Sequence, residues 1–286
     1  MKIIYKIIIF LHKIVVFYEY SYYNKDMKFC LVINHTKPFA EDFAKEFCSE
    51  IEKQGFSYYL FDNEILPNTD FAVVFGGDGT ILKFIRSTAV TVPVLGINCG
   101  KMGFLAESGK TASEYLYDLS TGNYSLDKRH FLKVECKNEC YYALNEAVLG
   151  RSDTINLMEI AVSTQSGVLD HYRADGVIVA TPTGSTAYSL SAGGPVLSPK
   201  VPAFVVTPIC PHSLQSRPIV LPDEEEISIK GSSAGTCALV VDGITVQTGE
   251  GELEVKLCGG TEGVSFVRFD RRSFYTIMLG KFAKGR

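Results

Sequence analysis

Apolar residues in the first half of the chain recur with two different spacings. Short apolar runs of strand length lie at 29–33, 71–75 and 93–97. Between the first two runs an apolar side chain recurs at every fourth position: Phe39, Phe43, Phe47 and Ile51. That spacing predicts a helix with one buried face, and further helices are predicted at 81–86 and over 115–119. Strands that alternate with helices are typical of a parallel sheet covered by helices, so we expect a Rossmann-like α/β domain over residues 27–121.

The pattern changes after about residue 124, where turns and glycines become frequent and helical spacing is scarce. Segments 227–229 and 253–257 alternate apolar and polar residues with period two, which predicts antiparallel strands. We therefore expect a second, mainly antiparallel β domain over residues 122–261. The tail, 262–286, is expected to return to the first domain as a strand and a short helix.

The opening residues, 1–26, are expected to lie outside the fold. Their apolar stretch is broken by Lys6, His12 and Lys13, which leaves it too short and too interrupted for a membrane span. No small-residue cleavage site follows it, which argues against a secretory signal. Because Met27 begins what looks like a normal first strand, the segment is interpreted as an added leader or a mis-assigned start.

Composition narrows the class of protein. The 286 residues are 46% hydrophobic and 21% charged with a net charge of −4, which is typical of an ordinary globular protein and not of one that coats nucleic acid. Any phosphate must then be bound by local groups and not by a broad positive field. The eight cysteines include no Cys-x-x-Cys pair and are interpreted as reduced thiols of a cytoplasmic protein, although their even number leaves a disulfide framework open.

A glycine-rich loop stands at the predicted strand-to-helix junction, where residues 75–80 read Phe-Gly-Gly-Asp-Gly-Thr. Glycines there let backbone N–H groups approach an anion, and the helix dipole favours negative charge, which predicts a phosphate cradle. Asp78 would repel phosphate unless it accepts a proton from an attacking hydroxyl or helps to hold magnesium. Taken alone, the motif is equally compatible with a glycine turn in which Asp78 bonds its own backbone.

A second polar segment follows a predicted strand at 177–180 and is crowded with small hydroxylated residues over 181–191. Such residues leave room for a planar base and can read its edge, while Tyr188 could lie against a ring or a ribose. The alternative is a structural turn in which Ser185 or Thr186 caps a short helix that contains Tyr188 and Ser191.

Asn145 and Glu146 interrupt an otherwise apolar strand over 141–149. Burying an ionised Glu146 is costly unless hydrogen-bond donors meet it, and a ribose diol offers two of them. An Arg or Lys partner would satisfy the carboxylate equally well. Other signals are weaker: 95–104 is a second glycine-rich loop suited to the same sheet edge, His212 is interpreted as structural, and Asp242 with Gly243 as a hairpin turn.

Taken together, these segments resemble the NAD kinase family. The motifs that carry the resemblance occur in family order over residues 28–286, at 76–80, 95–98, 103–105, 145–146, 175–176, 181–188, 193–195 and 210–214. The first motif is shared with sphingosine, diacylglycerol and phosphofructo-kinases, so the resemblance depends on the combination.

The resemblance implies an ATP-dependent kinase that phosphorylates the 2′-hydroxyl of the adenosine ribose of NAD and gives NADP. Asp78 would be the catalytic base, and Mg²⁺ would neutralise the triphosphate. The ATP phosphates would be held by Gly76, Gly77, Gly79 and Thr80. The implied NAD-binding residues are Asp78, Gly79, Phe104, Asn145, Glu146, Arg173, Asp175, Thr186, Ala187, Tyr188 and Ser191.

Within that set the resemblance assigns different parts of NAD to different residues. Asn145 and Glu146 would grip the ribose or base and Phe104 would wall the pocket. The adenine slot would consist of Thr186, Ala187, Tyr188 and Ser191. Asp175 would bind the other end of NAD or a ligand of a neighbouring subunit, and Arg173 would favour NAD over NADH.

The resemblance also implies a homodimer or homotetramer assembled through the β domain, with NAD and ATP as ligands and neither nucleic acid nor a membrane as partner. Two other functions stay open from the sequence. A lipid kinase shares the glycine-Asp loop but should have a broad apolar acceptor pocket, whereas 181–191 is rich in hydroxyls. A dinucleotide-binding regulator without turnover would not need Asp78.

Overall fold

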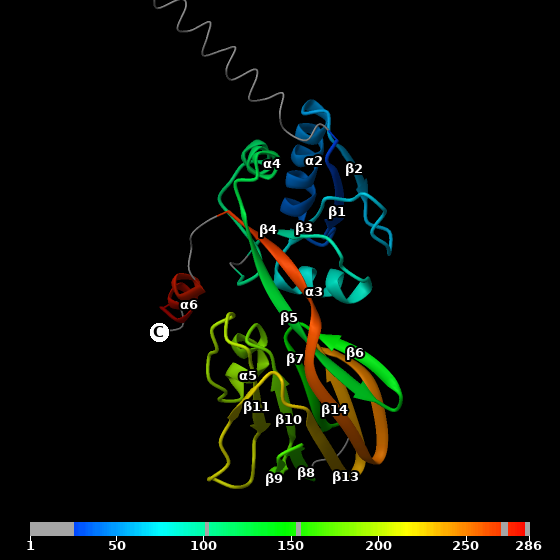
Figure 1. The fold of residues 1–286 in the computed structure, drawn as a ribbon, viewed down its shortest axis with the longest axis vertical. Coiled ribbons are helices and arrows are strands. Elements are labelled where there is room, and N and C mark those ends of the chain that lie inside the picture. Colours follow the sequence, from blue (N-terminus) through cyan, green and yellow to red (C-terminus); the bar gives the residue numbers. More distant parts are fainter. Residues whose placement is uncertain (1–25, 101–102, 153–155, 270–273, 284–286) are drawn as a thin grey trace, which may run out of the picture. The chain divides into compact units, whose positions relative to one another are not determined.

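A computed structural model describes residues 26–100, 103–152, 156–269 and 274–283, which divide into two compact units (Figure 1). Of the described residues, the first unit comprises 26–127 and 266–269, and the second comprises 128–265 and 274–283. The interpretation of 1–26 falls on residues that lie outside the described part, apart from residue 26.

The first unit is built on a parallel sheet. Its strands are β1 (Lys28–Ile33), β2 (Ser57–Leu60), β3 (Phe71–Gly76) and β4 (Val94–Asn98). They lie in the order β4-β3-β1-β2, and each neighbouring pair is parallel. The three strands expected from apolar runs are confirmed; β2, which is short and carries no apolar run, was not predicted. All carboxyl ends of these strands point to one edge of the sheet.

Helices cover both faces of this sheet. They are α2 (Pro38–Lys53), α3 (Asp78–Ser87) and α4 (Ala112–Thr121). Helices α2 and α4 share a core with one face of the sheet, to which Phe47 and Tyr115 contribute fully buried rings. Phe39, expected on the buried face of α2, is 60% exposed. A spacing of four residues drifts by about 40° per step around a helix, so four successive positions cannot all face the sheet.

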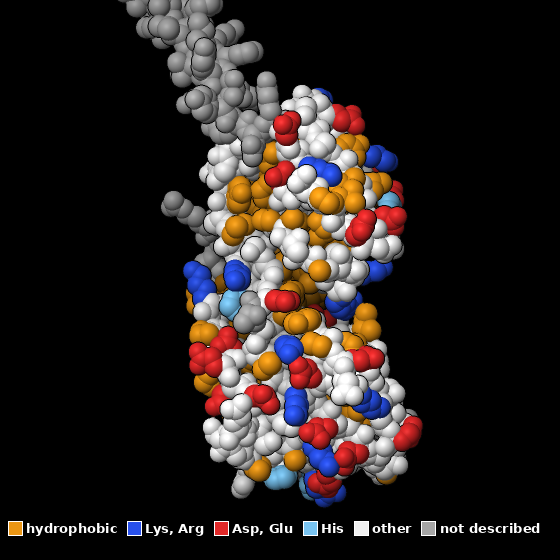
Figure 2. Space-filling model, turned by 45° about the vertical axis from the view of Figure 1, so that its right-hand side comes forward, with side chains coloured by type: hydrophobic (Ala, Val, Ile, Leu, Met, Phe, Trp, Pro, Cys, Tyr) orange, Lys and Arg blue, Asp and Glu red, His pale blue; other side chains and the backbone are white. Residues whose placement is uncertain are grey.

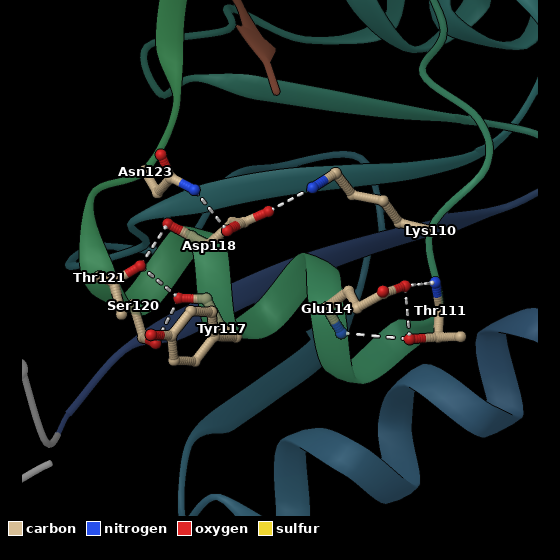
Figure 3. A network of polar contacts seen from close by, with 8 residues as sticks. All are labelled: Lys110, Thr111, Glu114, Tyr117, Asp118, Ser120, Thr121 and Asn123. Carbon is tan, nitrogen blue, oxygen red and sulfur yellow. Dashed lines mark hydrogen bonds and ion pairs between the residues drawn. The ribbon is translucent and has the colours of Figure 1, made fainter. Parts of the chain in front are cut away.

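Local hydrogen bonds fix both ends of α4 (Figure 3). Thr111 precedes the helix and forms a reciprocal cap with Glu114, because each side chain accepts the other's backbone N–H. At the other end the chain leaves the helix through Gly122, whose φ of 71° is the left-handed conformation that glycine adopts at low cost. The carboxylate of Asp118 accepts hydrogen bonds from Lys110 and Asn123, which ties the segments on either side of the helix to it. The predicted helix end at Gly122 is confirmed.

The second unit is mainly antiparallel β structure. Its strands are β5 (Ser125–Cys136), β6 (Glu139–Ala143), β7 (Glu146–Arg151), β8 (Met158–Thr164), β9 (Gly167–Ala174), β10 (Gly176–Ala180), β11 (Ala203–Ile209), β12 (Ile219–Pro222), β13 (Ile227–Val241) and β14 (Ile244–Arg268). The central order is β12-β11-β10-β7-β13-β14. Strand β8 pairs with β13 and β9 with β8, while β5 pairs with β14 and β6 with β5. Inward-facing side chains of these strands form one buried core. The predicted α/β fold with a mainly antiparallel second domain is confirmed.

Short helices interrupt the second unit. A 3-10 turn (Gly184–Thr186) and α5 (Tyr188–Ser191) follow β10, and α6 (Phe274–Ala283) lies near the end of the chain. Strand β14 ends in the first unit, where Phe266 pairs with Val94 in parallel. Of the described residues in the expected tail 262–286, the end of the strand thus belongs to the first unit and α6 to the second.

The surface carries no extended field of one charge on the face shown in Figure 2, where acidic and basic side chains are interspersed over the β-rich unit. Among the described helices, none has the length and apolar character needed to cross a membrane.

Candidate active site

The glycine-rich loop connects β3 to α3 at the carboxyl end of a buried parallel strand. A Cβ on Gly76 would lie 2.4 Å from Thr80 Oγ1, so a larger residue does not fit there. Gly77 is the N-cap of α3, and Asp78 is the first residue of the helix. Among the described residues, no acceptor takes the backbone N–H of Asp78 or Gly79. These two donors are available to an anion at the helix N-terminus.

Thr80 is held by a residue that the sequence analysis did not identify. The Asn34 side-chain amide donates to Thr80 Oγ1 at 2.9 Å, which ties the segment after β1 to the loop after β3. The signal that could have found it is its place directly after the first predicted strand, because the carboxyl ends of neighbouring parallel strands meet at one edge.

The Asp78 carboxylate does not bond its own backbone, as the glycine-turn alternative required. Its Oδ2 accepts the backbone N–H of Phe104 at 2.8 Å, and its Oδ1 accepts that of Leu105 at 3.1 Å. A Cβ on Gly103 would lie 1.9 Å from Oδ1, so glycine is required for this close approach. A carboxylate has about four acceptor sites, and two therefore remain after these bonds. The two glycine-rich loops are thus joined through the carboxylate, which has a fixed orientation and spare acceptor capacity.

The second loop is fixed from its other side by Arg268, near the end of β14. Its guanidinium donates to the carbonyl oxygens of Phe104 at 3.1 Å and Leu105 at 2.9 Å. It also pairs with Glu107 at 2.9 Å and Asp127 at 3.3 Å, and its side chain is only 14% exposed. The same two residues that donate N–H groups to Asp78 are therefore held through their carbonyls.

In the second unit, the single strand expected over 141–149 is broken in two. Strand β6 ends at Ala143 and β7 begins at Glu146. At the break the Asp242 carboxylate accepts three backbone N–H groups, from Leu144 at 2.8 Å, Asn145 at 2.8 Å and Glu146 at 3.1 Å. These bonds replace the ladder bonds that a continuous strand would make. Asp242 does occupy the predicted hairpin turn, between β13 and β14, but it also fixes the backbone of Asn145 and Glu146.

Glu146 is buried, and no Arg or Lys pairs with it among the described residues. The residue is 8% exposed, and its Oε2 atom finds no hydrogen-bond partner in the part of the chain that the structure describes. Burial, reinforced by the negative charge of Asp242, raises the pKa of Glu146 to about 7, and the Tyr188 backbone N–H opposes this only in part. A buried acceptor without a partner is costly, and a ligand hydroxyl could satisfy it.

The hydroxyl-rich segment after β10 folds back onto this break. Thr181 Oγ1 donates to the Leu144 carbonyl at 2.6 Å, and the Thr181 N–H donates to the Asn145 carbonyl at 2.8 Å. A Cβ on Gly184 would lie 2.1 Å from the Asn145 carbonyl oxygen, so the two backbones can touch only because residue 184 is glycine. These contacts, with the Tyr188 N–H near Glu146, place α5 beside the acidic site.

The expected helix cap in this segment is wrong. The N-cap of α5 is Ala187, and none of the described side chains caps the helix. Ser185 instead donates to the Pro182 carbonyl at 2.7 Å and accepts the Leu197 N–H at 2.9 Å, because it is fully buried where only the chain itself can satisfy its hydroxyl. Tyr188, by contrast, is 46% exposed. Thr186 and Ala187 are partly buried, while Ser191 is exposed.

Two other predicted site residues have acidic or basic partners of their own. Arg173 pairs with Glu159 at 2.8 Å on the surface, and Asp175 pairs with Arg151 at 2.9 Å. Among the described residues, no hydrogen bond or ion pair joins Arg173 or Asp175 to Glu146. His212 has an exposed side chain, and its backbone N–H donates to the Arg173 carbonyl at 2.8 Å, which is a structural contact.

The predicted site residues therefore form two clusters, each within one unit. The first consists of Gly76, Gly77, Asp78, Gly79, Thr80 and Phe104. The second consists of Asn145, Glu146, Thr186, Ala187, Tyr188 and Ser191. A glycine-rich loop at the start of a helix on a parallel sheet, together with a buried carboxylate in a β-rich unit, is typical of a nucleotide-binding protein.

Known proteins with similar sequences identify the family to which this class of protein belongs. The family model for the ATP-NAD kinase N-terminal domain matches residues 20–124, and that for the C-terminal domain matches residues 144–269. The NAD kinase of Caldicellulosiruptor bescii is 34% identical over 259 residues, which cover 89% of this chain and 99% of that protein. The NAD kinase of Chloroherpeton thalassium is 34% identical over 283 residues, with 91% and 99% covered.

Solved structures agree with the sequence relatives. Yeast NADH kinase in complex with NADH matches with a TM-score of 0.80 at 26% identity, covering 90% of this chain and 87% of that one. An NAD kinase from Archaeoglobus fulgidus in complex with ATP matches with a TM-score of 0.73 at 25% identity, covering 90% and 98%. The chain belongs to the NAD kinase family, as the resemblance of its motifs implied.

Proposed function

We propose that this chain, a kinase by its family, transfers the γ-phosphate of ATP to the 2′-hydroxyl of the adenosine ribose of NAD and so produces NADP. The observation that carries the proposal is the Asp78 carboxylate, held by the N–H groups of Phe104 and Leu105 inside the phosphate loop. Phosphoryl transfer depends mostly on positioning and charge, and an oriented carboxylate beside a phosphate cradle provides both.

Asp78 acts as the catalytic base in this proposal. Its two remaining acceptor sites can receive the proton of the ribose hydroxyl as that oxygen attacks the γ-phosphorus. The bonds from Phe104 and Leu105 fix which way the carboxylate faces, so Phe104 both positions the base and, with its ring, forms a wall of the NAD pocket.

The ATP phosphates are bound by Gly76, Gly77, Gly79 and Thr80 in this proposal. The available N–H groups at the start of α3 and the helix dipole support an anion here. Mg²⁺ would supply charge neutralisation of the triphosphate. No three acidic, His or Cys side chains cluster among the described residues. Such an ion would take most of its ligands from phosphate oxygens, and Asp78, the acidic residue of the loop, would be available to it.

The second cluster binds NAD. The partnerless Oε2 of Glu146 supports an acceptor for ribose hydroxyls, with Asn145 beside it. Tyr188 is exposed next to this carboxylate, which supports an adenine slot formed with Thr186, Ala187 and Ser191. Asp175 would bind the other end of NAD or a ligand of a neighbouring subunit, and Arg173 would favour NAD over NADH. Their present ion pairs with Arg151 and Glu159 would then have to open or be shared.

We further propose a cytoplasmic enzyme that forms a homodimer or homotetramer through its β domain. Among the described residues the eight cysteines form no disulfide, and Cys30, Cys99, Cys136 and Cys237 are buried, which suits a reducing compartment. The lipid-kinase and non-catalytic alternatives have no support among the relatives reported above, all of which are NAD or NADH kinases.

The test is a substrate comparison with the purified full-length protein. Incubation with magnesium-ATP and either NAD, NADH or sphingosine should give a phosphorylated product with NAD, identified as NADP by an NADP-specific dehydrogenase. Phosphorylation of sphingosine alone, or of none of the three, would refute the proposed function.

A further inference from the structure

One lysine of the first unit is placed over the phosphate loop. Lys37 lies between β1 and α2, where it is the N-cap of the helix. The turn that presents it is tightly bonded: the Lys37 N–H donates to the Asn34 carbonyl at 3.0 Å, and the Thr36 hydroxyl and N–H both donate to Asn34 Oδ1. Because Asn34 also bonds Thr80, this turn and the phosphate loop are held as one piece.

The Lys37 ammonium lies over the glycines of both loops. A Cβ on Gly77 or on Gly100 would lie 3.4 Å from Lys37 Nζ. The positive charge also reaches the Cys99 thiol, where it opposes in part the burial that raises the pKa of that group. The ammonium is therefore positioned at the carboxyl edge of the sheet, beside the backbone that the glycines leave bare.

This ammonium has no acidic partner among the described residues, and its side chain is partly buried. Other lysines of the same unit are paired: Lys45 with Asp42, Lys53 with Glu50 and Lys110 with Asp118. A cation withdrawn in part from solvent without a counter-charge is unfavourable, so an anion would gain by binding next to it. Phosphate oxygens are anions of the kind that a flexible ammonium binds as a point charge.

We propose that Lys37 is a further phosphate-binding residue of this site, whose ammonium contacts the terminal phosphates of ATP and stabilises the charge that develops during transfer. The proposal rests on the proposed function and adds a residue to it. The glycines at 77 and 100 place no side chain between the Nζ atom and the backbone beside it. It also supplies a cation to a loop whose only charged residue over 75–80 is Asp78.

The test compares Lys37→Met and Lys37→Arg with the matched control Lys45→Met. Lys45 lies on the same helix, two turns further on, and its side chain is 77% exposed. Lys37→Met should lower kcat/KM for ATP by about 10- to 100-fold while KM for NAD changes by less than about threefold. Lys37→Arg should recover much of the loss, and the control should match the wild type. Thermal melts should place all three variants near the wild-type Tm.

A binding measurement separates this proposal from the proposed function. Titration calorimetry with tripolyphosphate, without NAD, should show binding to the wild-type protein and to Lys45→Met, and a loss of about tenfold or more in affinity for Lys37→Met. Equal affinity of all variants for tripolyphosphate, or kcat/KM for ATP unchanged in a folded Lys37→Met, would overturn the role of Lys37 and leave NAD phosphorylation intact. Absence of NADP formation by the wild-type protein would instead refute the function, and the calorimetry would still test Lys37.

Discussion

The substitution Glu146→Gln tests the electrostatics of the second cluster. Glu146 is buried beside Asp242, its Oε2 has no partner among the residues that the structure describes, and its pKa is raised to about 7. Glutamine has nearly the same shape and resembles the neutral form of the acid. The change should therefore remove the cost of ionising the side chain in the folded protein and leave the packing unchanged.

The size of the effect follows from the pKa. Raising a carboxyl pKa from 4.5 to about 7 corresponds to about 3 kcal/mol between the fully protonated and fully ionised folded states. The folded state binds the proton more tightly than the unfolded chain. The stabilisation that protonated Glu146 gives the folded wild-type protein, relative to the ionised form, is therefore complete below pH 4.5. It is lost as the pH rises through about 7. At pH 8 the free energy of unfolding of Glu146→Gln should exceed that of the wild type by up to about 3 kcal/mol.

The assay is denaturant unfolding at pH 5, 6, 7 and 8, followed by a signal from the β-rich unit. The matched control is Glu254→Gln, an exposed glutamate on β14 of the same unit. The difference between Glu146→Gln and wild type should grow from pH 5 to about pH 7 and level off by pH 8, and the control should show no such trend. A Glu146→Gln protein that is less stable than wild type at pH 8, or a difference independent of pH, would refute the reasoning.

Three further predictions concern the loops and the ribose site. Gly103→Ala places a Cβ 1.9 Å from Asp78 Oδ1, so kcat should fall by at least about tenfold in a protein that still folds. Steady-state kinetics measure kcat and a thermal melt checks folding; an unchanged kcat would contradict the prediction. Gly184→Ala forces a Cβ to within 2.1 Å of the Asn145 carbonyl oxygen and should lower the free energy of unfolding, measured with urea, by about 2 kcal/mol or more. The control is Gly55→Ala, whose Cβ would meet no described atom within 4 Å; its φ of 76° alone should lower the free energy of unfolding by about 1 kcal/mol. KM for NAD of the wild type should fall as the pH rises through about 7, because ionised Glu146 is the proposed acceptor of the ribose hydroxyls, and Glu146→Gln should lose that trend.

Local patterns in the sequence predicted much of the fold. Apolar runs identified β1, β3 and β4, and the glycine at 122 marked the end of α4. Strand β2 was missed because its four residues carry no distinctive pattern. The exposure of Phe39 shows the limit of spacing, since the drift of a four-residue repeat around a helix takes it off the buried face.

The motifs of the candidate site could be predicted from the sequence, but the hydrogen bonds that join them could not. The sequence identified Asp78 and the second glycine loop separately, but the bonds from Phe104 and Leu105 join residues 26 and 27 positions apart. Asp242 was interpreted only as a turn, although it fixes three N–H groups about a hundred residues earlier in the chain. Such contacts depend on how strands are ordered in the sheet, and a single sequence does not reveal that order.

The role of Asp78 is tested most directly by NADP formation in Asp78→Asn. Asparagine keeps one acceptor for the N–H groups of Phe104 and Leu105 but turns its own N–H₂ toward the other, so a thermal melt must accompany the assay. Asp42→Asn, an exposed residue of α2, is the control. We predict that NADP formation by Asp78→Asn falls by about 10² to 10⁴ while the protein stays folded and still binds NAD, and that the control keeps wild-type activity. A folded Asp78→Asn that forms NADP at the wild-type rate would contradict the account.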